Sequence, residues 1–187
     1  WVTRKLLPSR ERAATEPRTT TSSGLTIAIS RAIQGWQATI CPADGVLWIP
    51  ALAGATAPEW NAAARAGWFG LAASHGRAHL ARALLEGNAF ALRDVLEAIR
   101  AAGHTATELV CVAGGARGDL LRQIRADVTG LPVTRPDDVE TTARGAAMLA
   151  AAGVGLHPDV ASASRDMASP RSEPLLPRQE CREIYDA

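Results

Sequence analysis

A glycine pair between an apolar run and a helix-like stretch is the feature that most constrains this chain. Residues 109–113 read LVCVA, and residues 114–128 read GGARGDLLRQIRADV. An apolar run that meets glycine predicts a short buried strand ending in a tight turn. The apolar side chains that follow recur at helical spacing, which predicts a helix from about Asp119 to Val128. A strand, a glycine turn and a helix therefore follow one another directly.

This arrangement suits a phosphate group or the sugar–phosphate part of a nucleotide. Glycine lets the backbone approach a ligand closely, and a helix start offers unpaired N–H groups and a positive dipole end. Gly114, Gly115 and Gly118 are therefore candidate ligand contacts, with Asp119 as a hydrogen-bonding cap. The spacing matches neither the P-loop nor the dinucleotide fingerprint. Taken alone, the stretch leaves an ordinary strand-to-helix turn open as the alternative.

The flanking sequence alternates between strand and helix patterns. Residues 45–52 and 131–136 predict strands, whereas residues 53–71 read as loop and turns. Residues 74–102 predict a long helix, and residues 137–153 predict another one, capped by Asp137 or Asp138. This order predicts an α/β lobe with a partly parallel sheet.

The long helix of residues 74–102 is apolar over most of its surface. Its polar positions recur every three, four or seven residues, which predicts one narrow solvent-facing stripe on a mostly buried helix. The stripe consists of His79, Arg82, Glu86, Arg93, Glu97 and Arg100.

Aromatic side chains and histidines in this part of the chain are expected to be structural. We expect Trp48, Trp60 and Trp68 to pack rather than to stack on a sugar. We expect His75 and His79 to serve the start of the long helix and its polar stripe.

Composition excludes several classes of protein. The 187 residues suffice for one domain or lobe, and 20 basic against 19 acidic residues argue against a nucleic-acid binder. No apolar run approaches the roughly 20 residues of a membrane helix. Cys41, Cys111 and Cys181 lie 70 residues apart, which indicates reduced thiols in a cytoplasmic protein and no metal site. A chain that starts at Trp1 without a signal sequence is expected to be a fragment or a truncated product.

The stretch AGWFGLAASHGRAHLARALLE, residues 66–86, resembles a signature of the FGGY carbohydrate kinases, the family of xylulose, gluconate and glycerol kinases. Other stretches follow in the family's order: residues 45–67 resemble its strand and substrate-lobe loop, and residues 112–133 its adenosine-binding turn and helix. Residues 139–155 resemble its final helix. The signature positions are Ala66, Trp68, Gly70, Leu71, His79, Leu80, Ala83, Leu84, Leu85 and Glu86.

The resemblance implies an α/β fold, the C-terminal lobe of the actin-like, ribonuclease-H-like ATPases, with a mixed sheet and packed helices. It divides the chain into three parts. Residues 1–23 form a disordered or irregular arm, residues 24–157 the nucleotide-binding domain, and residues 158–187 a tail with a short helix.

The resemblance also implies a set of nucleotide contacts. Gly114 and Gly115 would lie against the α-phosphate and adenosine of ATP. Asp119 stands where relatives often carry Asn or Ser near the adenine or ribose, and Gln34 in the stretch AIQGW would approach the adenine. No catalytic residue or metal ligand is assigned, because the family's phosphate loop and general-base aspartate belong to segments that this sequence lacks.

The implied function is that of an ATP-dependent carbohydrate kinase, with Mg²⁺ clamping the phosphates and a xylulose-like substrate favoured. The sugar or polyol would bind mainly to a missing N-terminal lobe, so the chain alone is expected to be inactive. A glycerol or polyol kinase lobe, a non-catalytic remnant that at most binds nucleotide, and an unrelated α/β nucleotide binder such as a dehydrogenase half remain alternatives. An exposed cleft face favours self-association into a homo-oligomer.

Overall fold

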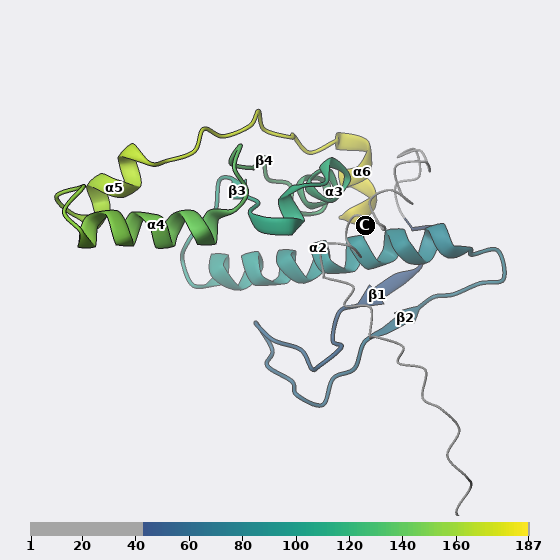
Figure 1. Cartoon of the computed structure of the whole chain (residues 1–187). Helices are drawn as coiled ribbons and strands as arrows, with labels where there is room; N and C mark the ends of the chain where they lie inside the picture. The colour runs from purple at the N-terminus through teal and green to yellow at the C-terminus, as the bar shows by residue number, and fades with distance from the viewer. Residues whose placement is uncertain (1–42, 187) are drawn as a thin grey trace, which may run out of the picture.

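The structure, a computed structural model, describes residues 43–186, and the predicted arm and Gln34 lie outside this range. The long helix α2 lies between α3 on one side and the ladder of β1 and β2 on the other, and a second short ladder, β3 and β4, lies beside α3 (Figure 1). The elements in chain order are β1 (Leu47–Ile49), β2 (Gly67–Phe69), α2 (Arg77–Ala101), β3 (Leu109–Val110), the 3-10 helix η1 (Ala113–Ala116), α3 (Asp119–Thr129), β4 (Val133–Thr134), α4 (Thr141–Gly153), α5 (Val160–Asp166) and α6 (Gln179–Tyr185).

The start of α2 uses the two histidines that the sequence places there. The Nδ1 atom of His79 accepts a hydrogen bond from the amide of Gly76, the N-cap residue, at 3.0 Å. His75 Nδ1 accepts one from the amide of Ala72 at 2.9 Å. His79 therefore has the predicted helix-start role, whereas His75 closes the turn that precedes the N-cap.

Strands β1 and β2 form an antiparallel ladder that packs on α2. Trp48 and Trp68 are directly opposed in it, with their ring centroids 4.5 Å apart, as expected for packing residues. Strand β2 corrects the prediction that residues 53–71 hold only loop and turns, because pairing with β1 supplies hydrogen bonds that three residues do not signal by themselves. Trp60 is 75% exposed, so the prediction that it packs is wrong.

Strands β3 and β4 form a parallel ladder, joined by η1 and α3. Leu109 pairs with Val133, and Val110 with Thr134. Helix α3 is buried on two sides. One side joins a cluster of Cys111, Ala116, Ala126, Val133 and Val139, and the other joins Ala89, Ile124, Val128, Cys181 and Tyr185.

The polar stripe of α2 departs from the prediction at its centre. Glu86 is only 3% exposed, and its Oε1 accepts hydrogen bonds from Tyr185 Oη at 2.6 Å and Arg82 Nε at 2.5 Å. The amide of Ala43 donates to Oε2 at 3.1 Å. Burial would lower the pKa of Arg82, but its hydrogen bond to Glu86 and the proximity of Tyr185 outweigh burial and raise it. Arg82 and Glu86 therefore belong to a buried hydrogen-bond network and not to the predicted solvent-facing stripe.

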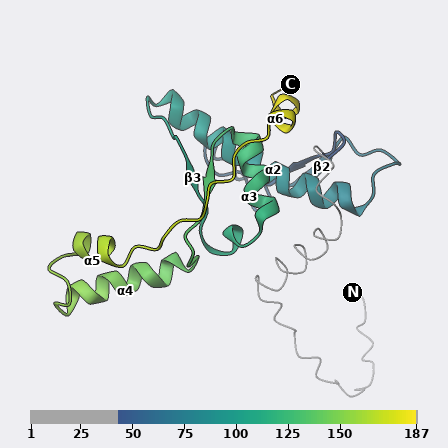
Figure 2. The same cartoon turned by 90° about the horizontal axis from the view of Figure 1, so that it is seen from above.

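The C-terminal segment returns to the core after α4 and α5, which lie side by side and extend away from α2 (Figure 2). Arg178 binds the fully buried carboxylate of Asp127 through Nε at 3.0 Å and Nη2 at 2.6 Å. Tyr185 of α6 meets Phe90 edge-on, with ring centroids 5.6 Å apart. The end of the chain thus closes the core over α2 and α3.

Helix α4 begins later than predicted. Its N-cap is Glu140, so neither Asp137 nor Asp138 occupies the predicted cap position. Asp138 acts from two residues upstream, where Oδ1 accepts the Glu140 amide at 3.0 Å and Oδ2 binds Arg144. That backbone hydrogen bond, together with Arg144, holds the pKa of Asp138 below its ordinary value.

Candidate functional site

The predicted tight turn connects β3 to α3. The backbone is extended at Val112, changes to φ +56° at Ala113, and forms the 3-10 helix η1 over Ala113–Ala116. Gly118 then becomes the N-cap of α3. Two helical segments therefore start within a few residues of the carboxyl end of β3, the edge at which α/β proteins commonly bind ligands.

Gly114 presents an open stretch of backbone at this turn. It is exposed, and a Cβ atom built on it would meet nothing within 4 Å. The neighbouring Ala113 amide donates to the carbonyl of Val139 at 2.9 Å. In a 3-10 helix the amide of the second residue has no acceptor within the helix, so the Gly114 amide is available to an outside acceptor.

A guanidinium lies beneath the same turn. A Cβ atom on Gly115 would lie 3.4 Å from both terminal nitrogens of Arg125. Arg125 Nη1 donates to the Cys111 sulfur at 3.1 Å, and no carboxylate in residues 43–186 forms an ion pair with it. Arg125 therefore brings positive charge to the turn that no described acidic group neutralises.

Asp119 occupies the first position of α3 rather than the cap. The N-cap is Gly118, which has no side chain, so the predicted capping role of Asp119 is wrong. The Asp119 carboxylate instead binds Arg122 Nη2 through Oδ1 at 2.6 Å. Its side chain is 80% exposed, so it faces solvent at the first residue after the turn.

The turn is also tied to the start of α4. Arg117 Nη2 donates to Glu140 Oε1, and both side chains are exposed. Gly114, Gly115 and Asp119 thus share one small region with Arg117 and Arg125. Sequence reasoning did not single out these two arginines. Only the three-residue spacing of Asp119 and Arg122 gave a local signal for an ion pair.

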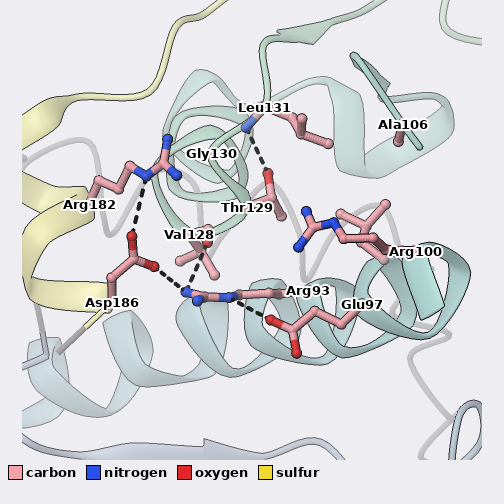
Figure 3. A pocket seen from close by; sticks show the side chains of 11 residues that line it. Arg93, Glu97, Arg100, Ala106, Val128, Thr129, Gly130, Leu131, Arg182 and Asp186 are labelled. Carbon is pink, nitrogen blue, oxygen red and sulfur yellow. Dashed lines mark hydrogen bonds and ion pairs between the residues drawn. The ribbon is translucent and has the colours of Figure 1, made fainter. Parts of the chain in front are cut away.

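A pocket of about 90 Å³ lies at the opposite end of α3 (Figure 3). Arg93 fills one side of it and binds Glu97 at 3.2 Å and Asp186 at 2.8 Å, along with the carbonyl oxygens of Val128 and Tyr185. Arg182 is the second partner of Asp186. Burial would raise the pKa of Asp186, but the hydrogen bonds and positive charges of Arg182 and Arg93 together outweigh burial and lower this pKa. These contacts fasten the end of α6 to α2 and α3.

Other kinds of site find no support in the described part of the chain. Among residues 43–186, no group of three His, Cys, Asp or Glu side chains is placed to hold a metal ion. None of the described helices is both long enough and apolar enough to cross a membrane. Cys111 and Cys181 are both buried, and Cys41 lies outside the described residues.

Comparisons with known proteins agree on one family. The model of the C-terminal domain of the FGGY family of carbohydrate kinases matches residues 1–154. Glycerol kinase of Rhodopirellula baltica is 42% identical over 156 residues, which cover 82% of this chain and 29% of the relative. Seven further bacterial glycerol kinases match at 38–45% identity. The chain thus spans about a third or less of the length of these curated relatives.

Solved structures give the same fold. Xylulose kinase of Rhodospirillum rubrum superposes with a TM-score of 0.66 at 28% identity, covering 88% of this chain and 32% of that one. Plasmodium falciparum glycerol kinase, solved with ADP, superposes with a TM-score of 0.64 at 24% identity, covering 86% and 32%. These findings confirm the predicted fold class, an α/β C-terminal lobe, although its strands form two short ladders. The chain belongs to the FGGY family of carbohydrate kinases, of which it carries the C-terminal domain.

Proposed function

We propose that the chain is the nucleotide-binding lobe of an ATP-dependent kinase that transfers a phosphoryl group to a hydroxyl of a polyol or sugar. Family membership supports the reaction class. The observation that carries the nucleotide role is the open backbone at Gly114, where neither a side chain nor a neighbouring atom stands in the way of a ligand.

The residues at the turn fit the chemistry of a nucleotide. The free amide of Gly114 is a donor for a phosphate oxygen, and the guanidinium of Arg125 adds positive charge beneath Gly115. In this proposal Gly114 and Gly115 lie against the phosphate and adenosine, and Asp119 accepts hydrogen bonds from the nucleoside. Gln34 stays a prediction, because it lies outside the described residues.

Phosphoryl transfer needs groups beyond this lobe. Mg²⁺, when bound to the phosphates, would neutralise charge that develops in the transition state. The described residues offer no acidic cluster for it, so we assign its protein contacts to the other lobe, together with the acceptor hydroxyl and the general base. The isolated chain is then expected to bind nucleotide without transferring phosphate.

For the acceptor we favour a polyol over a sugar. The curated relatives named above are glycerol kinases at 38–45% identity, which makes glycerol the first substrate to test. The predicted preference for a xylulose-like substrate stays a prediction, with xylulose kinases among the structures of similar fold. Neither acceptor is expected to contact the glycine turn.

The division of the chain stays part of this proposal. Residues 24–157 would form the nucleotide-binding domain, with residues 1–23 as an arm and residues 158–187 as the tail that ends in α6. The family match runs from residue 1 to residue 154. A cytoplasmic location and self-association of the isolated lobe are likewise expectations.

Calorimetric titration of the chain with ATP and ADP tests the nucleotide role. We expect both nucleotides to bind, and Gly114→Val to weaken their binding on the order of tenfold or more, because the valine would occupy the space of the phosphate. The fold should survive, since nothing within 4 Å opposes a side chain there. Gly153→Val is the matched control, because its Cβ also meets nothing and it lies at the far end of α4.

Two results would contradict the proposal. One is the failure of the unmodified chain to bind either nucleotide. The other is equal binding by the unmodified chain and Gly114→Val. An assay of ADP release from ATP should show no increase when glycerol or xylulose is added to the chain alone.

A further inference from the structure

Arg122 is a buried guanidinium with one described partner. Its side chain is 6% exposed, and Nη2 binds Asp119 Oδ1 at 2.6 Å. Its Nε and Nη1 atoms are also buried, and neither has a hydrogen-bond partner in the described part of the chain. Because a guanidinium carries five N–H donors, most of the hydrogen-bonding capacity of Arg122 is left unused.

Stability alone does not account for an arginine at this position. Burying a charge and leaving donors unpaired both cost free energy. In the one described ion pair of Arg122 the partner, Asp119, is 80% exposed, and an ion pair with an exposed partner contributes little to the free energy of unfolding. An apolar side chain of the same length would fill the space at lower cost.

Two further buried polar atoms without a partner among the described residues lie at the end of β4, the strand that α3 contacts. In β4 the buried hydroxyl of Thr134 has no hydrogen-bond partner, and neither has Nε of Arg135, the next residue. Thr134 is the last residue of β4 and Arg135 follows it, so both lie at the carboxyl end of the parallel pair β3–β4. Buried polar groups that the protein leaves unsatisfied are common where a fold serves function rather than stability.

The ion pair with Arg122 fixes the position of the Asp119 carboxylate. Arg122 occupies Oδ1, whereas Oδ2 has no partner among residues 43–186 and belongs to a side chain in solvent. The guanidinium has little room to move away, because its side chain is only 6% exposed. Oδ2 of Asp119 is therefore held in place at the exposed start of α3, where it can accept a hydrogen bond from a ligand.

A carboxylate held in this way selects the part of a ligand that donates hydrogen bonds. It repels phosphates, whereas the free amide of Gly114 and the charge of Arg125 attract them. It accepts from ribose hydroxyls or from an exocyclic amine of the base. We propose that Arg122 is a positioning residue that holds Asp119 as a fixed acceptor for the donor groups of the nucleoside, which sets the direction in which a nucleotide lies across the turn. This inference rests on the proposed nucleotide-binding function.

The test compares ADP with two analogues that each lack one donor. 2′-Deoxy-ADP lacks a ribose hydroxyl, and inosine diphosphate carries a carbonyl in place of the 6-amino group. We expect the unmodified 187-residue chain to bind one of the analogues on the order of tenfold more weakly than ADP, since it loses a hydrogen bond to a charged group. The affected analogue identifies which donor Asp119 accepts.

The variants assign this discrimination to the pair. Asp119→Ala should bind ADP and both analogues with equal affinity. Arg122→Met should reduce the discrimination at least threefold while its melting temperature stays level or rises, because two unpaired buried donors are removed. Arg122→Lys should restore part of it. Arg182→Met is the control, because Arg182 pairs with Asp186 at the opposite end of α3.

The outcomes separate the two proposals. If the unmodified chain binds none of the three nucleotides, the proposed nucleotide function fails. If it binds them without discrimination, or if Arg122→Met discriminates as well as the unmodified chain, the positioning role alone is overturned. Unfolding of Arg122→Met, or loss of discrimination in Arg182→Met, would also overturn it, because the arginine would then act through stability.

Discussion

At the scale of single residues, Gly87 sets how closely α2 approaches β1. A Cβ atom at this position would lie 2.1 Å from the carbonyl oxygen of Trp48, far inside van der Waals contact. Backbone atoms cannot give way as a flexible side chain would. A residue that looks like a weak point in a helix is therefore required by packing.

We expect Gly87→Ala to lower the free energy of unfolding by about 1–3 kcal/mol, the usual cost of overpacking, despite the better helix propensity of alanine. Denaturant unfolding monitored by circular dichroism measures the change. Gly145→Ala in α4 is the control, because its Cβ meets nothing within 4 Å and it should stabilise the protein slightly. Equal stability of Gly87→Ala and the unmodified chain would show that α2 and β1 are not in contact at this point.

At the scale of elements, the start of α4 depends on a carboxylate outside the helix. Asp138 accepts the amide of Glu140 and binds Arg144, and both contacts lower its pKa. Because the folded pKa is depressed, the ionised carboxylate stabilises the fold above its ordinary pKa of about 4. This contribution is lost as the pH falls through the lowered pKa.

We therefore expect Asp138→Asn to melt at a lower temperature than the unmodified chain at pH 7, with the gap closing as the pH falls below about 4. Melting curves across pH 3–7 measure both. Asp137→Asn serves as the control, because Asp137 is exposed and no side-chain hydrogen bond of it is present in the described structure. A gap that stays constant over this pH range would contradict the assignment.

The elements found by the sequence are those whose signal is local. Periodic apolar residues located α2 and α3, and the glycines after β3 located the turn, because each pattern lies within one stretch. Strand β2 escaped notice because three residues form it only by pairing with β1. The helical pattern places Glu86 on the solvent-facing stripe. Its burial could not be predicted, because it depends on Tyr185, 99 residues further along. At the candidate site, glycine spacing indicated the turn, whereas the place of Arg125 beneath it depends on the fold.

At the scale of the whole molecule, the segment after α5 packs on the core and binds α3 through a buried ion pair. It is anchored by the ion pair of Arg178 with Asp127, whose carboxylate is fully buried. The pair does not stand alone, since Gln123 Nε2 and the Arg178 amide also donate to Asp127 Oδ1, at 2.9 and 2.8 Å. Asp127 therefore ties the start of α6 to α3, in addition to the contacts of Asp186 and Tyr185 at its other end.

We expect Arg178→Met to lower the free energy of unfolding by about 3 kcal/mol, because it leaves a buried carboxylate without its counter-charge. The same denaturant experiment measures it. Arg171→Met is the matched control, because Arg171 and Glu108 form an exposed pair whose loss should cost less than about 1 kcal/mol. Similar losses for the two variants would mean that the pair of Arg178 with Asp127 contributes no more to stability than an exposed ion pair does.

The contact between Glu86 and Tyr185 has a consequence for how the protein is made. Ninety-nine positions separate the two residues, so a ribosome adding about 5–20 residues per second needs on the order of 5 to 20 seconds to supply the second after the first. During that interval the carboxylate of Glu86 keeps its water and the adjoining leucines of α2 stay uncovered. The nascent polypeptide is therefore expected to need protection by a chaperone until α6 emerges.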